Sequence, residues 1–200
     1  DAPALKNADI GVAMGVRGTE VAKEASAMVL QDDEFSTIVE AIRLGRAIYA
    51  NIRTFVVYLF SCNISEILVV GLATLAGAPL PLLPLQILFL NLVTDVFPAL
   101  ALGVGPGAQD LMERRPRPAN ERILTRAHWR RIAWYGALMS ASVLGAMAAA
   151  HYLLQLDGTR TLTVSFCTLA LAQLWHVFNM RDTDAGGFRL RNEITTNPWV

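Results

Sequence analysis

Four apolar segments, each long enough to cross a lipid bilayer, most constrain how this chain can fold. A helix needs about 20 mostly apolar residues to cross roughly 30 Å of hydrocarbon. Segments of that length lie at about 55–75, 82–103, 132–154 and 161–180. Only 17% of the 200 residues are charged, whereas soluble domains average about 25%. The sequence therefore predicts a mainly α-helical, polytopic transmembrane bundle that has the lipid bilayer as a partner.

The basic residues are distributed unequally between the two ends of these segments. Of the 17 Lys and Arg residues, six precede residue 55, seven lie in 105–131 and three follow residue 180, which leaves Arg160 alone on the other side. Basic loops favour the cytoplasmic side. We therefore expect an integral, multi-pass protein of the plasma (inner) membrane, with residues 1–54, 105–131 and 181–197 in the cytoplasm. Because the net charge is zero, no nucleic-acid partner is expected.

The first 34 residues have a different pattern, which is typical of an α/β unit. The stretches "IGVAMG" and "AMVLQD" predict short buried strands, and "TEVAKEAS" between them predicts one or two helical turns opened by Thr19. A piece below about 40 residues rarely folds unaided. We therefore expect residues 1–34 to be the end of a larger cytoplasmic domain, and residues 181–200 to be a tail that leads to a further, truncated span.

A long helix is predicted between this unit and the first span. Asp32, Asp33 and Glu34 resemble an acidic helix start, and no proline follows until Pro79. A single helix over 35–75 would be about 60 Å long, of which roughly half fits in hydrocarbon. Its first part, 35–54, would then be a cytoplasmic stalk. The alternative is two helices with a hinge near Gly45.

Polar residues interrupt the first two spans. The first span carries Asn63 and Glu66, and the second carries Asn91, Thr94 and Asp95, each set at a spacing that shares one helix face. An acid at the centre of a span costs about 2.5–3.5 kcal/mol on the insertion scale. Neither span contains a Lys or Arg that could pair with these acids. The pattern therefore predicts that the two spans bind a cation together.

The chemistry of these side chains narrows the choice of cation. Carboxylates, amides and hydroxyls are hard oxygen ligands, which suit Ca²⁺ and, with less preference, Mg²⁺ or Mn²⁺. Pro98 cannot donate to the carbonyl of Thr94, so a local helix break is expected to free carbonyls as further ligands. Gln173 in the fourth span is an additional candidate. The alternative is that these polar groups only hold the helices together.

Several motifs resemble those of P-type cation-transporting ATPases. The stretch "DAPALKNADIGVAMGVRGTEVAKEASAMVL" is similar to the end of their phosphorylation domain, and "DDEFSTIVEAIRLGRAIYANI", "SCNISE", "PLPLLPLQILFLN" and "NLVTD" extend the resemblance to about residue 118. "NLVTD" resembles the calcium pumps of the second class, because the sodium–potassium pumps have a second aspartate where Asn91 stands. The resemblance implies that the rod is the stalk and fifth membrane helix and that the later spans are the sixth to eighth.

The resemblance also implies roles for individual residues. Asn63, Glu66, Asn91, Thr94 and Asp95 would be the ligands of the transported ion. Asp1 would close the Gly-Asp-Gly-x-Asn-Asp motif and support the Mg²⁺ and phosphoryl site without being phosphorylated itself. Gln173 stands where pumps that carry two Ca²⁺ ions have a glutamate in the eighth helix, which predicts that one of the two ion sites is weakened or absent.

The function implied is that of an ATP-driven cation pump, an ion-translocating ATP hydrolase, with Ca²⁺ as the first candidate for the transported ion. ATP and Mg²⁺ would be bound mainly by the rest of the same polypeptide, whose nucleotide domain, actuator domain and other membrane helices would be partners. Three alternatives stay open. The pump could carry Mn²⁺ or a monovalent cation, the chain could belong to an ATP-independent cation transporter, or it could be an inactive fragment.

Overall fold

The computed structural model describes residues 2–105, 110–118 and 120–181 of the chain. Asp1 and the tail from residue 182 onwards, where the sequence predicts the approach to a further span, lie outside the described residues. The described chain is mostly helical with one short sheet, which confirms the predicted fold class. It divides into two units, Asp1–Arg46 and Ala47–Val200.

The N-terminal unit is a small α/β arrangement. Its elements are α1 (Ala2–Asn7), β1 (Val12–Met14), α2 (Glu20–Ala25) and β2 (Met28–Leu30). The two strands pair with each other in parallel. Helix α2 lies in the connection between them, because parallel neighbours must be joined by a crossover. The Thr19 side chain accepts a hydrogen bond from the Ala22 backbone N–H at 3.3 Å, so it caps α2 as its position in the sequence predicts.

Asp33 has a different role from the one expected at a helix start. The following helix begins at Ser36 and has no acidic residue in its first turn. Instead, the Asp33 carboxylate accepts the backbone N–H groups of Val16 and Arg17, each at 2.9 Å. Its side chain is only 8% exposed, and its φ of 56° lies in the left-handed region. Asp33 therefore fastens the loop after β1 to the end of β2.

These hydrogen bonds make the N-terminal unit sensitive to the charge of Asp33. The Val16 N–H, followed by the other donors, lowers the pKa of this carboxyl below its usual value. The bonds are consequently present at neutral pH and are lost as the pH falls through the lowered pKa. We expect Asp33→Asn to increase hydrogen exchange at the Val16 and Arg17 amides, since asparagine tolerates a positive φ but removes the charge.

The matched control for this change is Asp9→Asn, because Asp9 is an exposed carboxylate of the same unit. Exchange measured by mass spectrometry on the full-length protein should rise only for the Asp33 variant, and only in the peptide that contains Val16 and Arg17. Equal protection in both variants would show that the Asp33 carboxylate does not hold this loop.

Helix α3 (Ser36–Leu75) is a single helix of 40 residues. It continues without interruption through Gly45, so the helix is not divided at the position considered for a hinge. Its end is defined by Gly77, whose φ is 65°. The N–H of Gly77 bonds to the carbonyl of Thr74, and that of Ala78 bonds to the carbonyl of Ala73. This is the Schellman arrangement that terminates helices at a glycine.

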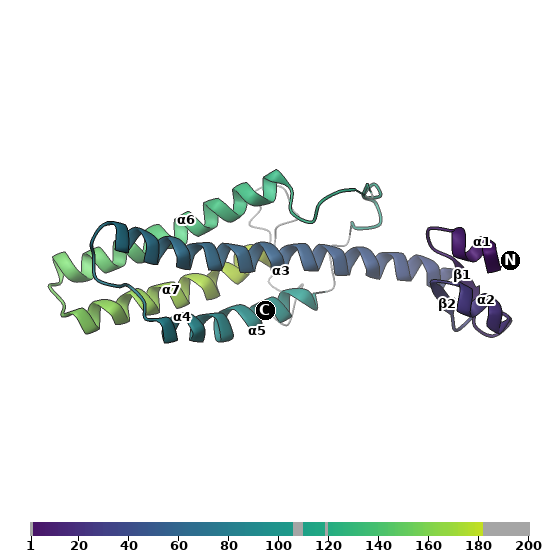
Figure 1. The fold of residues 1–200 in the computed structure, drawn as a ribbon, viewed down its shortest axis with the longest axis horizontal. Helices are drawn as coiled ribbons and strands as arrows, with labels where there is room; N and C mark the ends of the chain where they lie inside the picture. The colour runs from purple at the N-terminus through teal and green to yellow at the C-terminus, as the bar shows by residue number, and fades with distance from the viewer. Residues whose placement is uncertain (1, 106–109, 119, 182–200) are drawn as a thin grey trace. The chain divides into compact units, whose positions relative to one another are not determined.

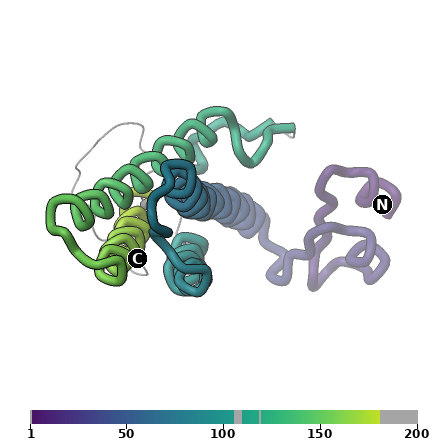
Figure 2. The backbone as a smooth tube through the Cα atoms, turned by 60° about the vertical axis from the view of Figure 1, so that its left-hand side comes forward, coloured from purple at the N-terminus to yellow at the C-terminus, as the bar shows by residue number. Residues whose placement is uncertain are grey.

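Three further helical segments complete the second unit. The second span consists of α4 (Pro84–Leu90), the π-helical turn η1 (Asn91–Asp95) and α5 (Val96–Gly103). The third consists of α6 (Arg126–Ala148) and the π-helical turn η2 (Ala149–Leu153), and the fourth is α7 (Gly158–Arg181). Each of these three spans, like α3, is long and apolar enough to cross a membrane. Figures 1 and 2 show the four helical segments lying side by side.

The core of the second unit consists of two apolar clusters at different heights of the bundle. One contains Val57, Tyr58, Cys62, Leu102, Ile132, Val177 and Met180. The other contains Val69, Leu82, Leu90, Val143 and Leu169. On α3, on the second span and on α7, the predicted polar residues lie in the interval between the two clusters. The apolar clusters therefore border a polar layer on two sides.

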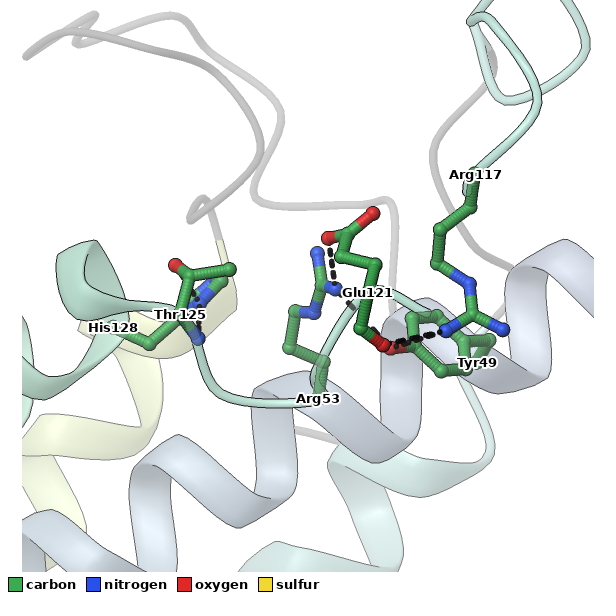
Figure 3. A network of polar contacts seen from close by, with 6 residues as sticks. All are labelled: Tyr49, Arg53, Arg117, Glu121, Thr125 and His128. Carbon is green, nitrogen blue, oxygen red and sulfur yellow. Dashed lines mark hydrogen bonds and ion pairs between the residues drawn. The ribbon is translucent and has the colours of Figure 1, made fainter. Parts of the chain in front are cut away.

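The loop before α6 is attached to α3 by a cluster around Tyr49 (Figure 3). The Arg117 guanidinium lies 4.0 Å from the centre of the Tyr49 ring and donates to the Tyr49 hydroxyl at 3.1 Å. Arg53 forms an ion pair with Glu121 at 2.7 Å. Arginine over an aromatic face is a favourable contact, so the two arginines join this loop to α3.

Candidate ion-binding site between the membrane helices

A layer of buried polar side chains crosses the bundle between the two apolar clusters. Glu66 comes from α3, Thr94 and Asp95 from η1, and Gln173 from α7. Their exposed fractions are 5% for Glu66, 2% for Thr94, 4% for Asp95 and 0% for Gln173. Groups this deeply buried must find partners within the protein or bind a ligand. The second span faces α3 and α7 with the residues that the sequence singles out.

Gln173 connects the two antiparallel spans through its amide group. Its Nε2 donates to Glu66 Oε1 at 3.0 Å, and its Oε1 accepts from the Thr94 hydroxyl at 2.8 Å. One neutral side chain of α7 therefore holds a carboxylate of α3 and a hydroxyl of η1. The sequence places Gln173 only as an additional candidate, because helical spacing shows its face but not which groups it contacts.

Asp95 is paired with the side-chain amide of Asn63 in the first span. The Asn63 side chain donates to Asp95 Oδ2 at 3.2 Å and to the Leu59 carbonyl at 2.8 Å. Asp95 Oδ1 is buried and has no hydrogen-bond partner among the described residues. Neither Asp95 nor Glu66 forms an ion pair with a basic side chain in the described part of the chain. The negative charge of this layer is therefore not balanced by the described residues.

The second span is not broken at this layer, contrary to expectation. Residues Asn91–Asp95 form one π-helical turn that leads directly into α5. Such turns insert an extra residue into a helix and occur frequently at functional sites. Asn91, at the start of the turn, is half-buried, and its side chain interacts with Glu66.

The carbonyl of Thr94 already has a hydrogen-bond donor, which corrects the expectation that it is left free. Pro98 leaves this carbonyl without the amide donor of an α-helix, as the sequence predicts. The hydroxyl of Tyr58, however, donates to it at 2.6 Å. Pro98 therefore does not leave the Thr94 carbonyl without a donor.

The arrangement suits a hard cation held by few charges. Two carboxylates, two asparagines, a threonine and a glutamine bring oxygen atoms from three helices to one layer. Within the described residues, no group of three or more His, Cys, Asp and Glu side chains is placed to hold a metal. A site with carboxylate and neutral oxygen ligands has the chemistry of Ca²⁺ coordination, whereas Zn²⁺ favours nitrogen and sulfur ligands.

Comparison with known families identifies the chain. Residues 79–200 match the family described as cation transporting ATPase, C-terminus, which is more than half of the sequence. The chain belongs to the cation-transporting ATPase family. The match begins just after α3 and includes the whole second span with Asn91, Thr94 and Asp95. Together with the four apolar helices, it makes the chain part of an integral membrane protein.

The relatives of this chain are named for two different transported ions. A calcium-transporting ATPase of Bacillus subtilis is 48% identical over 181 residues, which is 90% of this chain and 20% of that protein. A calcium-transporting ATPase of the endoplasmic reticulum type from Arabidopsis thaliana is 53% identical over 125 residues, 62% of this chain and 12% of that protein. A P-type sodium-transporting ATPase4 of Plasmodium falciparum is 54% identical over 138 residues, 69% of this chain and 11% of that protein.

The chain thus spans a fifth or less of the length of these three relatives. A further buried polar residue, next to the polar layer, is not among the predicted site residues. Tyr58 is completely buried, and its hydroxyl lies among the predicted ligands. A signal was present, because a tyrosine in a membrane span must satisfy its hydroxyl when it faces the protein interior.

Proposed function

We propose that the full-length protein is an ATP-driven cation pump in which Glu66 and Asp95, with Asn63, Asn91, Thr94 and Gln173, bind the transported ion. The observation that carries this proposal is the pair of buried carboxylates on two facing helices, which have no basic partner among the described residues. A buried charge without a partner is costly, and a bound cation would offset that cost. The family membership supports the same reading.

Ca²⁺ is the proposed transported ion. The set of carboxylate, amide and hydroxyl oxygens favours it, and two of the relatives described above are named as calcium-transporting. Na⁺ is the second candidate, since a relative with 54% identity is named as sodium-transporting. Na⁺ is also a hard cation that neutral oxygens can hold, so the side chains of the layer do not exclude it.

The proposed mechanism couples this layer to ATP through the rest of the polypeptide. ATP, with Mg²⁺ screening its phosphates, would phosphorylate an aspartate outside this chain, and Asp1 would support that site. Formation and loss of the aspartyl phosphate would move α3, which carries Asn63 and Glu66, relative to η1, which carries Asp95. A changed ligand geometry lowers the affinity for the ion and releases it.

We further propose the plasma (inner) membrane as the location, with residues 1–54, 105–131 and 181–197 in the cytoplasm. In this arrangement 1–34 is the end of the phosphorylation domain and 35–54 is the stalk. The distribution of basic residues supports this orientation, because 16 of the 17 Lys and Arg residues lie on the side proposed as cytoplasmic.

The decisive experiment is ATP hydrolysis by the purified full-length protein, titrated separately with Ca²⁺, Mn²⁺, Na⁺ and K⁺ at constant Mg²⁺, beside a titration of Mg²⁺ alone. We expect Ca²⁺ to stimulate hydrolysis at the lowest concentration. Stimulation by Na⁺ alone would assign the pump to sodium. Cation flux into vesicles that proceeds without nucleotide, together with no stimulated hydrolysis, would instead support an ATP-independent transporter.

A further inference from the structure

Tyr58 carries the hydroxyl of an otherwise apolar cluster that borders the polar layer. Its exposed fraction is 0%, and it packs with Val57 and Cys62 in the first apolar cluster. Its ring also stacks on the His176 ring, with 5.7 Å between the centroids and 22° between the planes. Packing alone would be satisfied by phenylalanine. The hydroxyl therefore requires a separate explanation, because a buried hydroxyl is costly unless it is hydrogen-bonded.

The Tyr58 hydroxyl reaches the backbone of two helices at residues of the polar layer. It donates to the Thr94 carbonyl at 2.6 Å and lies 3.4 Å from the Gln173 carbonyl. The side chains of these same two residues bond to each other at 2.8 Å. One hydroxyl on α3 thus contacts the main chain of η1 and α7 where their side chains enter the proposed site.

The contact with Thr94 has a specific cause in the sequence. In an α-helix the N–H four residues later would bond to the Thr94 carbonyl, but that position is Pro98, which has no N–H. Pro98 is itself buried, so water does not readily replace the missing donor. The Tyr58 hydroxyl supplies a donor from another helix at the point where the second span lacks its α-helical donor.

We propose that Tyr58 is a positioning residue of the cation site: its hydroxyl ties the Thr94 backbone to α3 next to the Gln173 carbonyl, and so fixes how the side chains of Thr94 and Gln173 enter the site. This inference rests on the proposed function of the polar layer. Its consequence is that the side chains of Thr94 and Gln173 are held at a fixed distance from Glu66, which lies two turns further along α3. Loss of the hydroxyl would loosen this geometry without removing any ligand.

The test is Tyr58→Phe in the full-length protein, which keeps the ring and removes only the hydroxyl. Equilibrium binding of Ca²⁺ without ATP, and of Na⁺ in parallel, reads the site directly, and ATP hydrolysis is measured beside it. A net hydrogen bond of about 0.5–1.5 kcal/mol predicts a roughly two- to twelvefold higher Kd for the cation. The maximal hydrolysis rate at saturating cation should stay within about twofold of wild type.

The matched control is Tyr135→Phe. Tyr135 lies on α6 with its ring against the same histidine, at 4.4 Å between centroids, and its hydroxyl makes no hydrogen bond that the structure describes. The Kd of this variant should equal that of wild type. An increase of the same size in both variants would show that any hydroxyl in the aromatic group matters, and the proposal would be wrong.

Pro98→Ala provides a second and more specific test. It adds a backbone N–H at position 98 that can bond to the Thr94 carbonyl, so the Tyr58 hydroxyl becomes less necessary. The effect of Tyr58→Phe on the Kd should therefore be smaller in the Pro98→Ala background than in wild type. If Tyr58→Phe alone does not accumulate, the double variant should restore accumulation. Additive effects, or a double variant that also fails to accumulate, would contradict the proposal.

Failure of this inference can be told apart from failure of the proposed function. If the wild type binds the cation but Tyr58→Phe has the same Kd, or loses only maximal rate, Tyr58 does not position the site and the pump reading is unaffected. If the wild-type protein binds neither Ca²⁺ nor Na⁺, the ion site and the role of Tyr58 are overturned together.

Discussion

Replacing Glu66 by glutamine, or Asp95 by asparagine, is expected to abolish cation-dependent ATP hydrolysis in the full-length protein at ordinary cation concentrations. Both replacements keep the shape of the side chain and remove one negative charge from a buried layer. Removing one partner of a buried, hydrogen-bonded charge pair costs about 2–5 kcal/mol, which corresponds to a roughly thirtyfold or larger increase in Kd. Hydrolysis titrated with Ca²⁺ over a wide range measures this shift.

The same variants should accumulate in the membrane at least as well as wild type. An acid in the middle of a span costs about 2.5–3.5 kcal/mol on the insertion scale, and the neutral amides reduce that cost. Glu113→Gln is the matched control, because Glu113 is an exposed acid in the loop before α6, and its titration curve should not move. Unaltered cation dependence in both Glu66→Gln and Asp95→Asn would refute the assignment of the site.

Replacing Gly136 by leucine should strongly reduce the amount of folded protein. Gly136 is buried on α6, and a Cβ at this position would lie 2.8 Å from Ile64 Cγ2 and 3.5 Å from the Ser61 carbonyl oxygen. One turn later, the Ser140 hydroxyl contacts the Ser65 carbonyl of α3 at 3.1 Å. A larger side chain would separate α6 from α3 and lengthen this contact. Overpacking of this kind costs about 1–3 kcal/mol, occasionally more.

The measurement is the monodisperse fraction of full-length protein after extraction in detergent, together with its midpoint of thermal unfolding. Gly136→Ala should have a smaller effect, because the nearest atom belongs to the Ile64 side chain, which can shift. Gly145→Leu is the control on the same helix, since nothing lies within 4 Å of a Cβ at that position. If Gly136→Leu and Gly145→Leu behaved alike, close packing of α6 on α3 would not be what Gly136 provides.

Much of the candidate site follows from the sequence, whereas the contacts between its helices do not. Asn63, Glu66, Asn91, Thr94 and Asp95 stand out because polar groups in lipid are costly wherever they occur, and the structure brings them to one layer. Their role as ligands stays a prediction. The amide of Gln173 could not be assigned its two partners in advance, since a hydrogen bond near 3 Å depends on the rotation and height of α7 against two other helices.

Two expectations about the backbone illustrate the same limit. The effect of Pro98 on the Thr94 carbonyl was predictable, because proline lacks an N–H wherever it stands. The π-helical turn and the donor from Tyr58 were not, because both depend on what another helix places beside that carbonyl. Asp33 is similar: its type suits a helix start, but the loop after β1 lies close enough to take its carboxylate.

The amino-acid sequence by itself determined the four apolar segments, the lack of proline over residues 35–75 and the residues that a bilayer penalises. These are properties of single segments, because hydrophobic length, proline positions and transfer costs do not depend on neighbouring elements. Only the tertiary structure decided which neutral groups hold Glu66 and Asp95 and which group donates to the Thr94 carbonyl. Those outcomes depend on contacts between helices far apart in the chain, where a small rotation decides whether two atoms bond.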